Sequence, residues 1–480
     1  MSPADDCLKT MTINIGLRSE RGPILLALMV TTGLIAIDAT ILATAVPTIV
    51  DDLGGFSQFP WLFSSYLLAQ AVSVPVYAKL SDTLGRKPII LVGIALFLLG
   101  SILCGIAWSM PALIAFRVVQ GLGAGAIQPM AITIAGDIYT LAERAKTQGY
   151  LASVWAVSSV VGPSLGGIFA ALDAWRWIFF INVPICVLAA FLLMRSFHEK
   201  IERVKHTIDY AGAILLTLSL SLLILAVLEG GQAWAWNSWQ SIGAFVVGGL
   251  LLIAFVLVER RAVEPVLPLW VFSRRLLLTT SLIALATGAL ITGLTSYVPT
   301  YLEGSIDTSP LLAGLALAAL TLGWPLAASI SGRWYLRYGF KRTAIVGLVV
   351  ALLGTVAVAA FASTPSVIIV AVACFVIGLG LGTSVTPSMI AAQSSVPWNE
   401  RGVVTGTNMF ARSIGSAVGV AIFGALFNSA VAGSVAPGPI TAASGVVFAA
   451  VVVVGVAAIV AAVLMPSTPV AAPVEPQPVE

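Results

Sequence analysis

Long apolar runs, separated by short polar connections, fill the chain from residue 23 to residue 465. Each run has roughly 18–25 residues, the length that a helix rising about 1.5 Å per residue needs to cross about 30 Å of hydrocarbon. Short segments of alternating polarity, typical of a membrane barrel, are absent from the sequence. The pattern predicts an all-α integral membrane protein with spans near 23–47, 60–80, 88–108, 111–134, 146–170, 178–196, 208–228, 238–259, 276–301, 311–331, 342–362, 366–391, 402–428 and 443–465.

The composition supports a protein that lies almost entirely in the bilayer. Apolar residues make up 59% of the 480 residues and charged residues 9%, whereas soluble domains carry about 25% charged residues. The first run contains an aspartate and is not followed by a small-residue cleavage site, so we expect it to remain as a span. Residues 1–22 form a polar tail, and the Pro-rich residues 466–480 are expected to be disordered.

The basic residues indicate the orientation, because they lie beside alternate ends of the predicted spans. Of the 24 Lys and Arg residues, all but Arg117, Arg176 and Arg412 fall on one side. The positive-inside rule makes this side cytoplasmic, with both termini inside. We expect a multi-pass protein of the bacterial cytoplasmic (inner) membrane.

An internal repeat with an offset of 257 residues relates the two halves of the chain. Gly121 matches Gly378, and Arg144 matches Arg401, each arginine being preceded by a glutamate. Two parallel bundles that face each other are the arrangement of alternating-access transporters. The predicted domains are an N-terminal six-helix bundle at 23–200, two inserted helices at 207–260 and a C-terminal six-helix bundle at 275–465.

Scarce charges inside the spans are the candidates for chemistry. Asp38 and Arg117 lie about 13 Å and about 9 Å from the outer ends of their spans, at similar depth. A charge there costs some 2.5–3.5 kcal/mol, which favours pairing the two. Burial and a nearby arginine act in opposite directions on the proton affinity of a carboxyl group. We therefore predict that Asp38 carries a proton and that Arg117 tunes it; the alternative is that Asp38 only anchors neighbouring helices.

The loop between the second and third spans resembles a known signature. Residues 78–87, Ala-Lys-Leu-Ser-Asp-Thr-Leu-Gly-Arg-Lys, are similar to the GxLaDrxGrk motif of the major facilitator superfamily, and depart from it at Ala78 and Thr83. The alternative is that the basic residues only set the orientation. The resemblance implies a gating latch formed by Asp82, Gly85, Arg86 and Lys87.

Three further motifs resemble the fourteen-spanning drug:proton antiporter branch of that superfamily, which is of the multidrug efflux type. Residues 38–47 are similar to DxTvvNvAlP, with Ala43 where Asn is usual, and residues 117–121 are similar to the RxxqG motif assigned to proton transfer. Residues 162–167 resemble the antiport motif GPxxGG. A packing kink is the alternative to a hinge here. The antiport hinge would comprise Gly162, Pro163, Gly166 and Gly167.

The substrate pocket is predicted from aromatic and polar residues within spans. Arg412 could serve there or could bond to backbone carbonyls. Few buried carboxylates favour a loosely selective apolar cavity, and polyanionic substrates would need more buried cations. The candidate pocket residues are Trp61, Tyr66, Gln70, Gln120, Trp155, Tyr297, Trp324, Asn408 and Arg412.

These patterns predict a proton-coupled antiporter that exports lipophilic drugs or toxic compounds, cationic ones among them, by alternating access. The alternative is a dedicated exporter of an endogenous metabolite or lipid. We expect a monomer in the lipid bilayer that handles protons and a small amphipathic molecule, with no cofactor, no metal and no nucleic-acid partner. The sequence lacks HExxH and GxSxG motifs and a soluble receptor domain, which argues against an enzyme or a receptor.

Overall fold

The computed structural model describes residue 16 and residues 19–54, 61–199, 209–231, 234–262, 265, 269–431 and 436–467. Two sequence-based predictions therefore concern residues outside these ranges. They are the structure of most of the N-terminal tail and of the C-terminal tail beyond residue 467.

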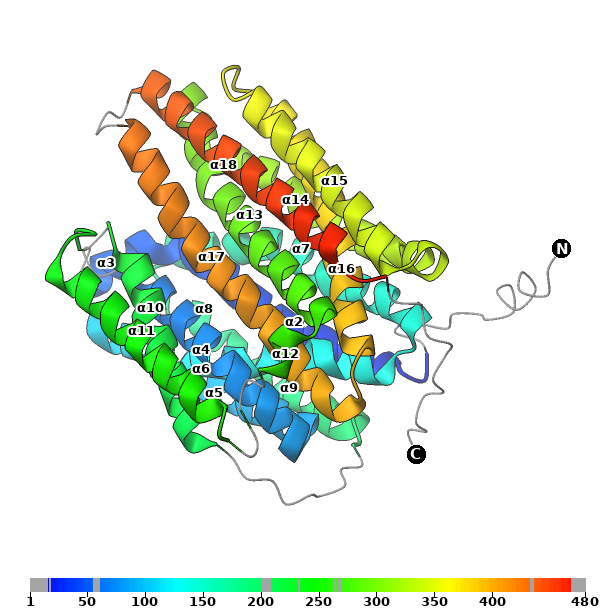
Figure 1. The fold of residues 1–480 in the computed structure, drawn as a ribbon. Coiled ribbons are helices and arrows are strands. Elements are labelled where there is room, and N and C mark those ends of the chain that lie inside the picture. The colour runs from blue at the N-terminus through cyan, green and yellow to red at the C-terminus, as the bar shows by residue number, and fades with distance from the viewer. Residues whose placement is uncertain are drawn as a thin grey trace.

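Helices occupy every predicted apolar run, because each run is long enough to satisfy its backbone hydrogen bonds internally (Figure 1). In the first half these are α2 (Gly22–Ile41), η1 (Leu42–Ala45), α3 (Val46–Leu53), α4 (Trp61–Leu84), α5 (Arg86–Gly105), α6 (Met110–Ile138), α7 (Leu141–Ala171), α8 (Trp177–Phe180) and α9 (Asn182–Ser196). An intervening pair comprises α10 (Tyr210–Glu229) and α11 (Trp239–Glu259). The second half contains α12 (Trp270–Ser273), α13 (Arg275–Ile306), α14 (Pro310–Tyr338), α15 (Phe340–Ala360), α16 (Val367–Ser394), η3 (Trp398–Glu400), α17 (Arg401–Val431) and α18 (Pro437–Leu464).

Twelve helices in the described part of the chain are long and apolar enough to cross a membrane. Neither α4, which contains Gln70 and several serines, nor α10, whose apolar stretch is Ala211–Val227, is among them. An all-helical membrane architecture is therefore established at twelve candidate spans, and the count of fourteen stays a prediction.

The two halves meet along two seams. Helix α7 packs against α14 on one side, and α4 packs against α17 on the other. Helix α10 packs on α4, α17 and α11, so the α10–α11 pair covers the second seam, beside α4 and α17 in Figure 1. An apolar cluster that includes Val72 of α4, Leu220 of α10 and Phe410 of α17 forms this contact.

The repeated glycines allow close packing at equivalent places in the two halves. A Cβ atom on Gly121 would meet the backbone of α4, and one on Gly123 the backbone of α5. In the second half, Gly378 lies against the backbone of α14 and Gly380 against that of α15. The 257-residue repeat is therefore a repeat of packing as well as of sequence.

Substitution of Gly123 by alanine is expected to destabilise the protein by roughly 1–3 kcal/mol, because overpacking forces the backbones apart. A Cβ atom there would stand 2.4 Å from the backbone nitrogen of Phe97. Thermal unfolding of purified protein in detergent measures the effect. Gly167→Ala is the matched control, because nothing lies within 4 Å of its Cβ position. If the two variants unfolded at the same temperature, the close-packing interpretation would be wrong.

Candidate proton-coupling site and gate

A buried ion pair lies inside the first half of the molecule. The Arg117 Nη1 atom of α6 donates to Oδ2 of Asp38 in α2 at 2.8 Å. The side chains of Asp38 and Arg117 are 1% and 2% exposed, so water does not screen their attraction. The structure thus brings together the two residues that the sequence analysis paired.

Amide side chains complete the surroundings of the carboxylate. Oδ1 of Asp38 accepts from Nε2 of Gln120 at 2.8 Å and from Nδ2 of Asn182 at 3.2 Å. Both amide groups also donate to Oγ of Ser101, at 2.8 and 3.3 Å. Because every group that faces Oδ1 is a donor, the pocket is built for an acceptor, which an ionised carboxylate supplies.

Arg117 is held on several sides. Its Nε donates to the carbonyl of Leu62 at 3.1 Å, and its Nη1 donates to Oε1 of Gln120 at 2.7 Å. Gln120 lies three residues after Arg117, so both project from one face of α6. The guanidinium also lies over the ring of Tyr66, 4.1 Å from its centre. These three contacts hold Arg117 beside Asp38 without involving the carboxylate.

The antiport motif touches the same region from α7. A Cβ atom on Gly162 would lie 2.0 Å from Oγ1 of Thr40, two residues after Asp38, so glycine permits this approach. Thr40 in turn donates to the carbonyl of Ser158 at 3.0 Å. Helix α7 is continuous from Leu141 to Ala171 through the motif. The hinge function of residues 162–167 stays a prediction.

Sequence reasoning did not assign Ser101 or Asn182 to this site. Asn182 is the first residue of α9 and comes near the start of the apolar run at 178–196, where an amide is unusual. This amide in an apolar run was the sequence signal that could have assigned Asn182 to the site. Ser101 carries no such signal, because serines are common in apolar helices and its partner is identified only by packing.

The candidate pocket residues do not gather at one place. Tyr66 and Gln120 belong to the Asp38 cluster. Tyr66 is also part of the apolar core of the first half, and Trp155 packs against that core. Tyr297 and Trp324 pack against the core of the second half.

The polar members of the set bond elsewhere. Gln70 donates to Oε1 of Gln128 at 3.3 Å, and Asn408 donates to the carbonyl of Thr280 at 3.0 Å. Trp61 is the first residue of α4 and is half-buried.

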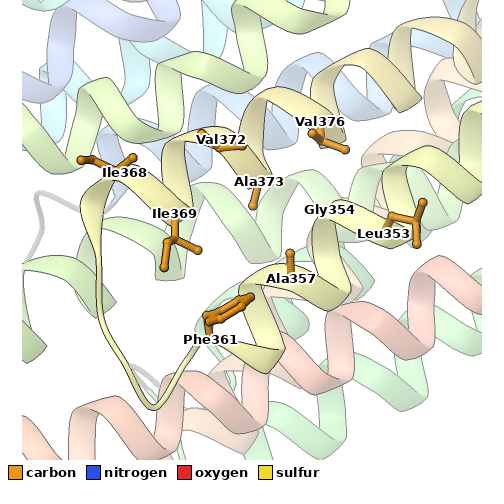
Figure 2. A pocket seen from close by; sticks show the side chains of 9 residues that line it. All are labelled: Leu353, Gly354, Ala357, Phe361, Ile368, Ile369, Val372, Ala373 and Val376. Carbon is orange, nitrogen blue, oxygen red and sulfur yellow. The ribbon is translucent and has the colours of Figure 1, made fainter.

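An apolar cavity of about 440 Å³ lies between α15 and α16 (Figure 2). It contains none of the predicted pocket residues and no charged side chain, so it offers only dispersion contacts. Its lining residues are Leu353, Gly354, Ala357, Phe361, Ile368, Ile369, Val372, Ala373 and Val376.

The predicted latch joins the two halves at the end of the molecule where the basic residues gather, called the basic end below. Oδ1 and Oδ2 of Asp82 accept from the backbone N–H groups of Gly402 and Val403, at 3.0 and 2.7 Å. These residues form the first turn of α17, where unpaired N–H groups and the helix dipole favour an anion. Asp82 of the first half thus caps a helix of the second half.

Arg86 is the centre of this latch and is 0% exposed. It pairs with Asp82 at 2.9 Å and with Asp137 at 3.1 Å, and its Nη2 donates to the carbonyl of Trp398 at 2.6 Å. The guanidinium also stacks on the Trp398 ring, 3.7 Å from its centre. One side chain therefore connects α4, α5 and α6 to the segment that precedes α17.

Gly85 and Lys87 have local functions beside it. Gly85 adopts φ +97°, which an L side chain rarely adopts, so glycine permits the turn between α4 and α5. The backbone N–H groups of Arg86 and Lys87 donate to the carboxylate of Glu199, each at 3.1 Å. In the second half Gly339 repeats the turn with φ +82°, but Leu336 replaces the aspartate and is 36% exposed.

Further contacts close the basic end, and the sequence analysis did not assign them. Arg401 of α17 pairs with Asp137 at 3.0 Å, and Arg144 of α7 donates to Oγ of Ser394 at 3.1 Å. The hydroxyl of Tyr335 donates to the carbonyl of Leu141. All three contacts join the two halves, so this end of the molecule is closed.

Acidification is expected to favour the closed basic end. Asp82 lies beyond the apolar run at 60–80, and burial raises its pKa to about 7, although Arg86 and the N–H groups of Gly402 and Val403 oppose the rise. The charge of Asp137 adds to it. In an open, hydrated end the pKa would return towards 3.8. At a pH between these two pKa values, closing the basic end therefore takes up a proton. The closed arrangement loses stability as the pH rises through about 7.

Spin labels on Arg195→Cys and Tyr338→Cys, in a chain without its native cysteines, report this change as a distance. Both positions are exposed, at the basic ends of α9 and α14. We expect the short-distance population to grow from pH 8 to pH 5 in the wild-type background and to grow less in Asp82→Asn, where the buried carboxyl group of Asp137 remains. An equal pH response in both would rule out Asp82 as the titrating group.

Comparisons with known proteins agree with this architecture. Residues 28–420 match the family model described as Major Facilitator Superfamily. The chain is 37% identical to "Multidrug resistance protein 3" of Bacillus subtilis (strain 168) over 389 residues, 81% of this chain and 76% of that protein. It is 33% identical to "Multidrug transporter protein MdtP" of the same organism over 414 residues, 86% of this chain and 76% of that protein.

The fold also matches solved structures. The human organic anion transporter MFSD10 (TETRAN) superposes with a TM-score of 0.67 at 14% identity, covering 92% of this chain and 99% of that chain. At this identity the likeness concerns the fold. Together with the family match over most of the chain, it leads to one conclusion: this chain belongs to the Major Facilitator Superfamily of membrane transporters, and not to a family of enzymes.

Proposed function

We propose that this chain is a proton-coupled antiporter that exports lipophilic compounds by alternating access. The observation that carries the proposal is the sealed Asp38–Arg117 pair, at 2.8 Å and almost without exposure. Ionisable residues within membrane spans are costly to bury, so they mark ion and proton pathways. The two relatives named as multidrug proteins support export of lipophilic cargo.

Asp38 acts as the proton carrier in this proposal, and Arg117 keeps its charge throughout. With Asp38 ionised, the two charges balance. Proton binding removes the negative charge and leaves Arg117 with the Leu62 carbonyl, the Gln120 amide oxygen and the Tyr66 ring. The tie between α2 and α6 weakens, which biases the helices towards another arrangement.

The basic end faces the cytoplasm of a bacterium in this proposal, and both termini lie inside, as the positive-inside rule favours. The latch around Arg86 then closes the cytoplasmic end, and protons reach Asp38 from outside. Helices α4 and α10 cross the bilayer with the twelve apolar helices, which makes fourteen spans. The protein works as a monomer with no cofactor beyond the proton gradient.

The experiment is dissipation of an imposed pH gradient in inverted membrane vesicles that contain the protein. Lipophilic candidates of different structure are added one at a time, and a pH-sensitive dye reports proton movement. We expect several compounds to dissipate the gradient, and none to do so in vesicles without the protein. A broad panel without any response would contradict drug antiport, and a response confined to one metabolite or lipid would favour a dedicated exporter.

A further inference from the structure

Arg412 is a cation deep in the second half that the proton-coupling site does not use. It lies roughly 16 Å along α17 from its first residue, on the face that carries Asn408 and Ser416 one turn away on either side. Asn408 and Ser416 both bond to backbone carbonyls of α13. Arg412 does not: among the residues that the structure describes, its side chain has no hydrogen bond, ion pair or ring contact.

The guanidinium nevertheless faces accessible space. Arg412 is half-buried. Some polar atoms of the described residues lack a hydrogen-bond partner and are also closed to solvent, but the Arg412 nitrogens do not belong to this group. The unpaired Arg412 nitrogens therefore keep accessible surface. Open donor groups on a cation are costly to place against apolar side chains, so the accessible space beside Arg412 suits a polar ligand.

No carboxylate pairs with Arg412 in the described part of the chain. Helices α13 to α18 contain one acidic residue, Glu303, three residues before the end of α13. Arg117 in the first half shows the opposite situation, because Asp38, Gln120 and a backbone carbonyl surround it. The middle of the second half therefore carries an uncompensated positive charge.

We propose that Arg412 binds the anionic head group of an amphipathic cargo, whose apolar part lies among the surrounding aliphatic side chains. A guanidinium presents five donors in a planar fork that matches a carboxylate, sulfonate or phosphate. The inference rests on the proposed export function and narrows its cargo, because a permanent cation would meet an unbalanced charge of the same sign. The same head-group chemistry occurs in anionic lipids.

A binding experiment without a gradient tests this inference. The probes share a dansyl group and an eleven-carbon chain and differ in the head group: dansylaminoundecanoic acid, its methyl ester and the corresponding terminal amine. The protein is held in neutral phosphatidylcholine nanodiscs, and empty nanodiscs give the background. We expect wild-type protein to bind the acid roughly tenfold to hundredfold more tightly than the ester, the usual effect of a charge-assisted hydrogen bond. The amine should bind most weakly.

Variants at position 412 identify the residue responsible. Arg412→Gln should reduce acid binding to the level of the ester and leave ester binding unchanged, whereas Arg412→Lys should keep part of the preference. Ser416→Ala is the matched packing control, because it removes a neighbouring side-chain bond to the Gly288 carbonyl and keeps the charge. Should Arg412→Gln fail to fold, the wild-type comparison of the three probes and the lysine variant still test whether Arg412 binds the anionic head group.

Equal binding of acid and ester by the wild type, or an acid preference that survives Arg412→Gln, would overturn the inference. Anionic phosphatidylglycerol that competes with the acid probe in the wild type alone would support it and identify a lipid as the source of the head group. If the protein bound the acid through Arg412 but failed the gradient assay, only the proposed proton coupling would be wrong. If it passed the gradient assay but bound the probes without regard to the head group, only this inference would be wrong.

Discussion

Replacement of Asp38 by asparagine is expected to abolish gradient-driven efflux, down to the level of membranes without the protein. The amide cannot carry the proton, and it places an N–H₂ group in a pocket where Asp38 accepts from three partners. Two of these, Gln120 and Asn182, are donor amides at 2.8 and 3.2 Å from the same oxygen. The third, Arg117, would keep a buried charge without a counter-ion, which typically costs about 3–5 kcal/mol.

Efflux of a fluorescent substrate from energised cells, normalised to the amount of protein in the membrane, measures the effect. Asp52→Asn is the matched control: it makes the same chemical change in a carboxylate that also pairs with an arginine, Arg176, at 2.8 Å. That pair is 40–47% exposed, so its loss should change efflux little. If Asp38→Asn transported as well as Asp52→Asn, another residue would have to carry the proton.

Replacement of Arg86 by alanine is expected to open the basic end. The side chain is fully buried and compensates Asp82 and Asp137 at 2.9 and 3.1 Å. Removing one partner from a buried charge network costs about 3–5 kcal/mol, because Asp82 then stays desolvated without its cation and Asp137 keeps only Arg401. A shift of that size changes a closed-to-open ratio by more than about a hundredfold.

The spin-label pair on Arg195→Cys and Tyr338→Cys reports the opening as a longer distance. Arg86→Lys is expected to open the end partly, because an ammonium cannot form the fork or stack on Trp398 as a guanidinium does. Lys87→Ala is the control, since the Lys87 side chain bonds only to the exposed carbonyl of Met194 among the described residues. A closed distance in Arg86→Ala would show that the contacts of Arg144 and Arg401 hold the end without it.

The sequence alone determined the helices and the central ion pair, for local physical reasons. An apolar run of membrane length can only be a helix, so the predicted spans agree with the observed helices within a few residues at most ends. The run at 23–47 does not form one continuous α-helix, because α2 ends at Ile41 and the chain continues through a 3₁₀ turn into α3. Asp38 and Arg117 could be paired because few other charges lie at their depth. The glycines of the repeat indicated close packing, because glycine-rich faces let helices approach.

Only the tertiary structure decided which distant side chains meet. Asp82 and Gly402 are 320 positions apart, and no local pattern links them. The same holds for Arg401 with Asp137, for Asn182 with Asp38, and for the α10–α11 pair that covers one seam. Arg412 is the converse case. Its sequence position left open whether it bonds to carbonyls or to cargo. In the described part of the chain the α13 carbonyls of Thr280 and Gly288 accept from Asn408 and Ser416, and no carboxylate pairs with Arg412.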